Sequence, residues 1–384
     1  MTILLINALM PEKDSKITNK LIFITSIENW GNTWFSKQHY AHELSKNNKV
    51  YFLNGVPNWR IKDLFSFRLG ITVINENLFS VSYRNNFPIR IFKHFFLFLN
   101  DILNSWKLKR VINQYPNKPV IFWLFDPGRF ITIPYRDKIK LIYHVVDPYT
   151  RFKTDKLLAK NADIIVSVSK KLAEPYSLYT SKTLIIPHGI SNDALAADEK
   201  NSGRDLTDSI MYVGSIYSGP YGINFELLNK ITDVFTDRKL VIIGKIIELN
   251  EQASVMWEAL KKRDNFLYIN EVPGNTLQNY IRLAKVCIIP YIYSKEYQHL
   301  FHSSHKFYNY IAQFKPVVSC MLHDLEYLNG KVIHIASNDD EFITYLKAVV
   351  YDEIKYDHST AQKFINDNSY DNHIKEIGEF LYKN

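Results

Sequence analysis

Short apolar runs separated by helical stretches recur along the whole 384-residue chain, and this alternation constrains the fold more than any other feature. In the first half the runs cover 21–26, 50–53, 78–81, 119–124, 140–145, 163–169 and 183–187. In the second half they cover 209–214, 239–244, 266–269, 286–291, 316–320 and 332–336. Strands that are apolar throughout, with helices between them, are typical of parallel sheets covered on both faces. The sequence therefore predicts an α/β protein.

The alternation stops once, at 195–207, where no apolar periodicity is present and the composition is typical of a linker. We therefore expect a first domain at 1–195, a second at 205–360, and C-terminal helices at 361–384 that pack back on the first domain. Two doubly wound sheets in tandem place a ligand cleft between the carboxyl ends of their strands.

Composition and motifs exclude several functional classes. The two cysteines, Cys287 and Cys320, lie in different apolar runs, which argues against a disulfide scaffold or a metal site and favours a reducing compartment. Neither half has a G-x-G-x-x-G after its first strand, and no Walker A sequence occurs, so dinucleotide and P-loop chemistry are not expected. The net charge of +8 fits a phosphate-bearing ligand or anionic lipid, or simply a solvated basic surface. No nucleic-acid-binding motif is present.

The chain also lacks the usual marks of membrane insertion. Residues 1–10 are apolar but short, and the lysines follow them instead of preceding them, unlike a signal peptide. No apolar stretch is long enough to span a bilayer. We therefore expect a cytoplasmic protein, peripheral on the inner membrane if it binds lipid at all.

One segment of the second half carries the chemistry. The run SSHKFYNYIA at 303–312, which includes Ser304, follows a strand that ends in Pro290 and Tyr291. A loop that leads into a helix presents backbone N–H groups and a positive dipole end to a diphosphate. Lys306 adds a full positive charge, and Asn309 lies one turn further on the same face. The alternative is a helix that packs on the sheet with an exposed lysine.

This segment resembles the nucleotide-sugar donor motif of GT-B glycosyltransferases. The resemblance implies two Rossmann-like domains that face a central cleft, and transfer of a sugar from a nucleotide diphosphate. The large retaining branch of these enzymes carries a glutamate at both ends of an E-x7-E span, but Phe301 and Asn309 stand at those positions here. A retaining mechanism is therefore not expected.

A closer resemblance is to the inverting, xanthan-type β-glucuronosyltransferases of bacterial exopolysaccharide synthesis. It implies that Gly214, Ser215 and Ile216 form the first turn of the donor site. It also implies that Glu271 contacts the nucleotide, that Tyr291 and Lys306 contact the phosphates, and that Asn309 replaces a glutamine. For Glu271 a surface acid, and for Tyr291 a core tyrosine, remain alternatives.

An inverting transfer needs a base that deprotonates the acceptor hydroxyl. Asp147 follows the strand at 140–145, where the resemblance implies that base, and Asp126 after the preceding strand is its rival. A turn aspartate that caps a helix is the alternative for both. His188, Arg129 and Arg151 are further candidates for binding an anionic donor or a lipid pyrophosphate, although a structural histidine and solvated arginines are equally consistent with the sequence.

The segment 89–108 predicts an amphipathic helix with one apolar face, flanked by basic residues. Its apolar residues are Phe92, Phe95, Phe96, Leu99, Ile102, Leu103 and Trp106, and its basic flank is Arg90, Lys93, Lys107, Lys109 and Arg110. The helix fits either the core of the first domain or an anionic lipid surface.

Together these features predict an inverting glycosyltransferase that moves a sugar such as glucuronate from a UDP-sugar to a saccharide or a polyprenyl-pyrophosphate-linked acceptor. We expect no cofactor and no metal, because Lys306 and the helix end can neutralise the diphosphate. The alternatives are a nucleotide-sugar 2-epimerase of the same fold and a non-catalytic subunit that binds a nucleotide sugar or glycan.

Overall fold

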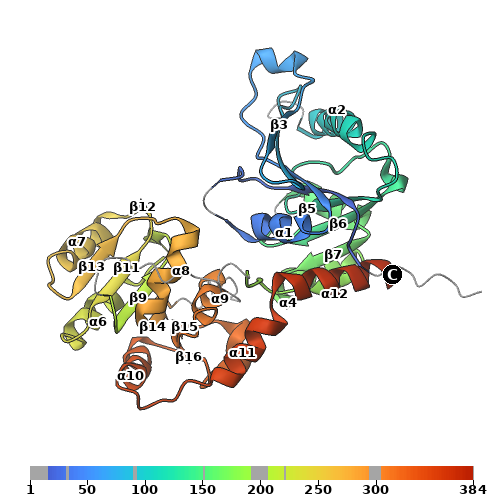
Figure 1. Ribbon diagram of the computed structural model, residues 1–384. Coiled ribbons are helices and arrows are strands. Elements are labelled where there is room, and N and C mark those ends of the chain that lie inside the picture. The colour runs from blue at the N-terminus through green and yellow to red at the C-terminus, as the bar shows by residue number, and fades with distance from the viewer. Residues whose placement is uncertain are drawn as a thin grey trace, which may run out of the picture.

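The computed structural model describes residues 16–31, 34–89, 93–149, 152–191, 206–219, 222–293 and 304–383, which form two α/β domains (Figure 1). Arg90, Phe92, Arg151, Phe301 and most of the predicted linker lie outside the described residues. The C-terminal helix of the chain returns to the first domain, as the red ribbon beside α1 and β7 shows in Figure 1.

In the described part of the first domain, eight strands form one sheet in the order β3-β4-β2-β1-β5-β6-β7-β8. The strands are β1 (Leu21–Thr25), β2 (Lys49–Leu53), β3 (Gly70–Val73), β4 (Leu78–Ser82), β5 (Val120–Leu124), β6 (Ile139–Val145), β7 (Ile164–Ser167) and β8 (Thr183–Ile185). All neighbours pair in parallel except β3, which runs antiparallel to β4 at the edge.

Helical segments cover this sheet on both faces. They are α1 (Ser36–Ser45), η1 (Ile61–Phe65), α2 (Lys93–Ile112), η2 (Arg136–Lys138), α3 (Lys153–Asn161), α4 (Lys170–Ala173) and η3 (Glu174–Leu178). Successive strand residues point to opposite faces, so Phe23 and Phe122 belong to one core and Ile22 and Trp123 to the other. The central strands β1, β2, β5, β6 and β7 are buried on both sides almost throughout, which explains why their sequences are mostly apolar.

The second domain repeats this plan with a parallel sheet of six described strands in the order β13-β11-β9-β14-β15-β16. They are β9 (Ser209–Val213), β11 (Leu240–Ile243), β13 (Phe266–Ile269), β14 (Ala284–Ile289), β15 (Val317–Cys320) and β16 (Ile333–Ala336). A short parallel pair, β10 (Ile216–Tyr217) and β12 (Ile246–Glu248), lies beyond β9 and β11.

The helices of the second half are α6 (Phe225–Val234), α7 (Glu251–Leu260), α8 (Gly274–Leu283), α9 (His305–Ile311), η5 (His323–Leu328), α10 (Asp339–Val350), α11 (His358–Asp367) and α12 (Tyr370–Lys383). Several begin at an Asn or Asp whose side chain accepts a hydrogen bond from the first turn. These caps are Asn224 on α6, Asn250 on α7, Asn338 on α10 and Asp357 on α11. Such caps satisfy N–H groups that lack an intrahelical partner, so they fix where each helix begins.

The predicted fold class, with two doubly wound parallel sheets, is confirmed. The sequence analysis did not predict β3, β10 or β12, because they lack the length or the burial of the other strands. All four residues of β3 are exposed, and β10 and β12 are only two and three residues long.

The chain leaves the second domain between α11 and α12. Phe364 of α11 still packs in the second core, so the predicted boundary at 361 falls inside this helix. Tyr370 of α12 packs in the first core, and α12 contacts α1 and β7. At the crossing Ile190 pairs with Ser369 in a parallel β-bridge, and the Ile190 amide donates to the Asn368 carbonyl oxygen at 2.8 Å.

Histidines gather around this crossing. The ring of His188, after β8, lies 5.3 Å from the ring of His305 on α9, and His39 of α1 stacks on Tyr370 at 5.2 Å. Burial lowers the pKa of His188 to about 3, with the nearby His305 and His373 as further causes. Burial also lowers the pKa of His373 on α12 to about 4. These rings are therefore neutral at pH 7.

We expect acid to destabilise this junction through His373. In the unfolded chain this histidine takes up a proton near pH 6.5, whereas the folded one stays neutral down to about pH 4. Acidification between these values therefore favours the unfolded state, by about 1.4 kcal/mol for each pH unit. His373→Gln should flatten the pH dependence of the thermal unfolding midpoint. His358→Gln, at the exposed start of α11, is the control and should keep the wild-type dependence.

Candidate functional site

The carboxyl ends of β13, β11, β9 and β14 are neighbours in the second sheet, and this order places the predicted donor residues in one row. Glu271 follows β13, Gly214 follows β9 and Tyr291 follows β14. Between Glu271 and Gly214, Gly244 follows β11. Parallel strands bring such residues to one edge, which is where α/β sheets bind ligands.

Gly214 and Lys306 are in close contact. Gly214 has a φ of +148°, and a Cβ built on it would lie 2.2 Å from Cε of Lys306. Gly244, with a φ of +152°, approaches Gly214 so closely that a Cβ would lie 2.0 Å from the Gly214 carbonyl oxygen. The missing side chain at Gly214 therefore leaves room for Lys306, and the missing side chain at Gly244 leaves room for the backbone of Gly214.

Two tyrosines surround the ammonium group of Lys306. Its Nζ donates to the Tyr291 hydroxyl at 2.6 Å and lies 5.3 Å from the centre of that ring. The ring of Tyr212, at the end of β9, lies 5.6 Å from the same atom. The faces of aromatic rings attract a cation, so the charge is held over the ends of β9 and β14.

Tyr310 fixes α9 above β9. Its hydroxyl accepts a hydrogen bond from the Val213 amide at 2.8 Å, one residue before Gly214. Tyr310 lies one turn after Lys306, so both side chains reach the same strand end. Because α9 has only seven residues, the positive charge at this edge comes mainly from Lys306 and less from the helix dipole.

The other predicted donor residues surround the Lys306 ammonium group and differ in how deeply they are buried. Ser304 is the buried N-cap of α9 and makes no capping hydrogen bond with its side chain. Ser215 is exposed, and its carbonyl oxygen accepts from the Tyr212 hydroxyl at 3.0 Å, while Ile216 is fully buried in β10. Asn309 is half-buried and faces α8, where Nε2 of Gln278 lies 3.5 Å from its Oδ1. Glu271 is exposed.

His188 connects the first domain to this edge. Its Nδ1 lies 3.4 Å from the Ser36 hydroxyl at the start of α1, and its ring packs against Tyr308 of α9 at 5.6 Å. Burial, together with the positive charge of Lys306, lowers the pKa of the neighbouring His305 to about 4. Both imidazoles are therefore uncharged, and Lys306 carries the charge at this junction.

In the first domain, the two candidate bases lie in different environments. Asp126 is buried, and its Oδ2 accepts from Nε and Nη2 of Arg129 at 3.2 and 3.1 Å. Asp147 is exposed and accepts from the Tyr149 hydroxyl at 3.2 Å. Burial raises the pKa of Tyr149, and the carboxylates of Asp147 and Asp126 raise it further, so Tyr149 remains a hydrogen-bond donor.

Arg129 is a buried structural group. Besides Asp126, its guanidinium donates to the Asn54 carbonyl oxygen and the Tyr83 hydroxyl, each at 2.8 Å, and to the Ser26 carbonyl oxygen. Acceptors of the protein thus occupy this side chain, which leaves it little capacity for a ligand.

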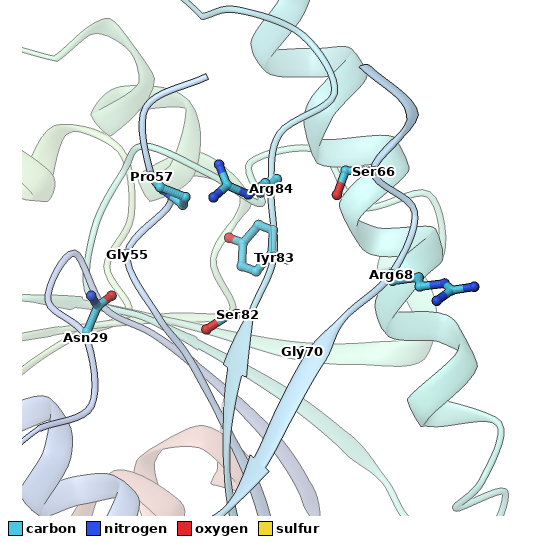
Figure 2. Close-up of a pocket in the computed structure, with 9 residues that line it drawn as sticks. All are labelled: Asn29, Gly55, Pro57, Ser66, Arg68, Gly70, Ser82, Tyr83 and Arg84. Carbon is cyan, nitrogen blue, oxygen red and sulfur yellow. The ribbon is translucent and has the colours of Figure 1, made fainter. Parts of the chain in front are cut away.

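A pocket of about 380 Å³ opens at the carboxyl ends of β2 and β4 (Figure 2). Its lining residues are Asn29, Gly55, Pro57, Ser66, Arg68, Gly70, Ser82, Tyr83 and Arg84. Figure 2 shows the Arg84 side chain beside Pro57, on the side of the pocket opposite Arg68. Nη1 of Arg84 lies 3.1 Å from Oδ2 of the buried Asp63. The sequence had singled out none of these residues.

Within the described ranges, no group of three or more His, Cys, Asp or Glu side chains is arranged to hold a metal ion. No helix in the described part of the chain has the length and apolar character needed to cross a bilayer.

Comparison with known proteins finds no matching family model, and no curated protein matches the sequence. Solved structures do match. A UDP-forming α,α-trehalose-phosphate synthase from Burkholderia xenovorans aligns with a TM-score of 0.63 at 12% identity, over 96% of this chain and 99% of that one. Anabaena HepE in complex with UDP and glucose aligns with a TM-score of 0.62 at 10% identity, over 94% of this chain and 99% of that one.

The chain has the GT-B fold. A UDP-GlcNAc 2-epimerase from Methanocaldococcus jannaschii is also similar, with a TM-score of 0.56 at 10% identity, over 96% of this chain and 100% of that one. The structural neighbours of this GT-B chain are thus mostly glycosyltransferases, together with epimerases of the same fold.

Sequence reasoning missed three residues of the edge at which Lys306 lies: Tyr212, Gly244 and Tyr310. A signal for Gly244 was present, because β11 ends in Ile-Gly where β9 ends in Val-Gly. Nothing in the sequence indicates that the Tyr212 ring lies beside Lys306 or that the Tyr310 hydroxyl reaches β9.

Gly214→Ala should distort the edge on which Lys306 lies. The positive φ alone costs about 1–3 kcal/mol for a residue with a Cβ, and the methyl group would also displace the Lys306 side chain. Gly219→Ala is the control, since Gly219 has a φ of +131° and no described atom lies within 4 Å of a Cβ built there. Thermal unfolding should show a larger loss of stability in Gly214→Ala than in Gly219→Ala, because only the first methyl group meets another side chain. Equal destabilisation of the two variants would contradict the contact with Lys306.

Proposed function

We propose that the chain is an inverting, metal-independent glycosyltransferase that moves a sugar, in the first instance glucuronate, from a UDP-sugar to a saccharide or polyprenyl-pyrophosphate-linked acceptor in bacterial surface polysaccharide synthesis. The observation that carries this proposal is the Lys306 ammonium group held over Gly214 at the ligand-binding edge of a GT-B second domain.

On the donor side, the positive charge of Lys306 stabilises the UDP leaving group as the sugar–phosphate bond breaks. The electron pair of that bond moves to the UDP oxygen, and a cation already in place stabilises the new charge without reorganisation. Tyr291 orients the ammonium group through its hydroxyl. Ser304 at the start of α9, Glu271 and Asn309 complete the donor site in this proposal, with Ser215 next to the phosphates.

On the acceptor side, Asp147 is the proposed base. The acceptor oxygen attacks the anomeric carbon, its proton passes to the Asp147 carboxylate, and the leaving UDP departs from the opposite face. The exposure of Asp147 supports this role over Asp126, whose carboxylate is buried against Arg129. The hydrogen bond from Tyr149 holds the Asp147 carboxylate at the end of β6.

The pocket beside β2 and β4 is the proposed acceptor site. The pocket and Asp147 lie at the same end of the strands of the first sheet, because both follow the carboxyl ends of parallel strands. Polar groups of Asn29, Ser66 and Ser82 fit sugar hydroxyls, and the arginines fit an anionic acceptor.

A second candidate is a nucleotide-sugar 2-epimerase, which the similarity to the Methanocaldococcus jannaschii enzyme favours. An epimerase converts its donor with no acceptor present. Product analysis without acceptor therefore separates the two functions.

The decisive experiment measures UDP release from a panel of UDP-sugars, with membrane extract as acceptor and EDTA present. We expect acceptor-dependent release from one donor. Lys306→Ala should lower kcat by about 10²–10³-fold through loss of charge stabilisation. Asp147→Asn should lower kcat by about 10²–10⁴-fold with UDP affinity unchanged, because the base acts only on the acceptor.

Two substitutions control this assay. Asp137→Asn changes an exposed aspartate at the opposite end of β6, and Lys347→Ala changes an exposed lysine of α10. Both should keep wild-type activity. Full activity of Asp147→Asn would exclude this residue as the base. Donor conversion without acceptor would establish the epimerase instead, and UDP-sugar binding with no turnover of any kind would indicate a binding subunit.

The acceptor pocket gives a separate prediction. Ser82→Trp places an indole in the pocket and should raise the KM for acceptor by at least about tenfold, with donor affinity unchanged. Thr72→Trp, at an exposed position of the adjacent β3 that does not line the pocket, is the matched control. An unchanged acceptor KM in Ser82→Trp would place the acceptor elsewhere.

A further inference from the structure

Helix α2 buries polar residues against the first domain. Asn100 donates to the carbonyl oxygen of Phe87 and accepts from its amide, each at 2.9 Å. The Asp101 carboxylate accepts from the amides of Phe130 and Ile131 at 2.7 and 2.8 Å. All these contacts fix the inner face of the helix through hydrogen bonds.

The buried face also contains a lysine. Nζ of Lys107 donates to the Arg84 carbonyl oxygen at 2.8 Å and to Oδ1 of Asn86 and Asn104 at 2.9 and 3.0 Å. Burial lowers its pKa to about 8. The sequence analysis placed Lys107 in the basic flank of this helix. The structure corrects this prediction, because the side chain of Lys107 is buried.

The outer face of α2 is aromatic. Phe95 is 59% exposed, Phe98 45% and Trp106 61%. Leu99 and Ile102 are half-buried between them, so the apolar positions follow the helical spacing along one outward stripe. A helix at a water-facing surface normally has the opposite arrangement, with its apolar face inward and its polar face outward.

A second apolar element lies next to this stripe. In η1, Ile61 is 81% and Phe65 78% exposed. The side-chain Nδ2 of Asn86 donates to the carbonyl oxygens of Leu64 and Ser66 at 3.0 and 3.2 Å. The Oδ1 of the same side chain accepts a hydrogen bond from Lys107 of α2. Figure 1 shows α2, β3 and the blue segment before β3 together at the end of the first domain farthest from the second.

The charge around these apolar residues is positive. Lys109 and Arg110 of α2, Lys62 of η1 and Arg68 after it are exposed. Nζ of Lys109 lies 6.0 Å from the Trp106 ring centre. The acidic residues of α2 and η1, Asp101 and Asp63, are both buried and already accept hydrogen bonds.

We propose that the outer face of α2 and η1 together form a docking surface for an anionic lipid bilayer, with α2 lying in the membrane plane. Aromatic side chains enter the boundary between headgroups and acyl chains, and lysines and arginines remain at the anionic headgroups. The exposed apolar residues and the positive charge of this surface both fit such a bilayer, whereas simple exposure to water explains neither feature. The inference does not depend on sugar transfer, because binding to lipid is measured without a donor or acceptor.

Co-sedimentation of the whole chain with vesicles tests the proposal. Binding should be strong to phosphatidylcholine vesicles that contain phosphatidylglycerol, weak to phosphatidylcholine alone, and weaker at high salt. The double variant Phe95→Ser/Trp106→Ser should lower the vesicle partition coefficient by about 10–100-fold. Tyr327→Ser is the matched control, because Tyr327 is 64% exposed on η5 of the second domain, and it should bind like the wild type.

Thermal unfolding and sedimentation velocity keep these results interpretable. The Phe95→Ser/Trp106→Ser variant should unfold at the wild-type temperature or above, since both side chains are already exposed. A charge-reversed Lys109→Glu/Arg110→Glu variant should lose binding to anionic vesicles with its apolar stripe intact. Undiminished vesicle binding by both variants would overturn the proposal. An absence of vesicle binding by the wild type would also overturn it. A dimer that the Phe95→Ser/Trp106→Ser substitutions dissociate would then show that a second copy covers this face.

Discussion

The guanidinium of Arg129 holds together the carboxyl ends of neighbouring strands in the first sheet. It binds the Ser26 carbonyl oxygen after β1, the Leu53 carbonyl oxygen of β2, the Tyr83 hydroxyl after β4 and the Asp126 carboxylate after β5. A buried charge of this kind is stable only while its partners are present, and breaking such a pair costs about 3–5 kcal/mol. The position of Tyr83, which lines the pocket, and of the strand ends beside it therefore depends on this one side chain, which the sequence presented as either a ligand-binding or a solvated arginine.

Most strands of both domains were predictable, because a strand that is buried on both faces of its sheet has an unbroken run of apolar residues. The edge at which Lys306 lies was partly predictable for the same reason, since Gly214, Glu271 and Tyr291 lie at or just after the ends of such runs and neighbouring parallel strands bring these ends together. The contact between Lys306 and Gly214 was not, because it depends on how α9 lies above β9. That placement comes from the Tyr310 hydroxyl and the Val213 amide, which are 97 positions apart in the sequence.

Periodicity left the orientation of α2 open for a related reason. An apolar stripe in a sequence shows which residues share a face, but the side on which the domain packs depends on the partners available there. In this domain the segment 85–87 and the backbone at 130–132 offer hydrogen-bonding groups, so Asn100 and Asp101 turn inward and Phe95 turns outward. Strand β3 was missed because its exposed residues follow no pattern of burial.

The pairing of Ile190 with Ser369 means that the chain's outward path toward the second domain and its return path from α11 lie side by side. Rotation of the domains about this bridge would keep the two connections paired, whereas sliding or separation of the domains would break the pairing. His188 and Tyr308 lie beside this axis, so we expect their packing to change little as the domains rotate. The parts of the domains farthest from the bridge would move most, and a small rotation at Ile190 would therefore change the distance between the edge that holds Lys306 and the pocket at Tyr83.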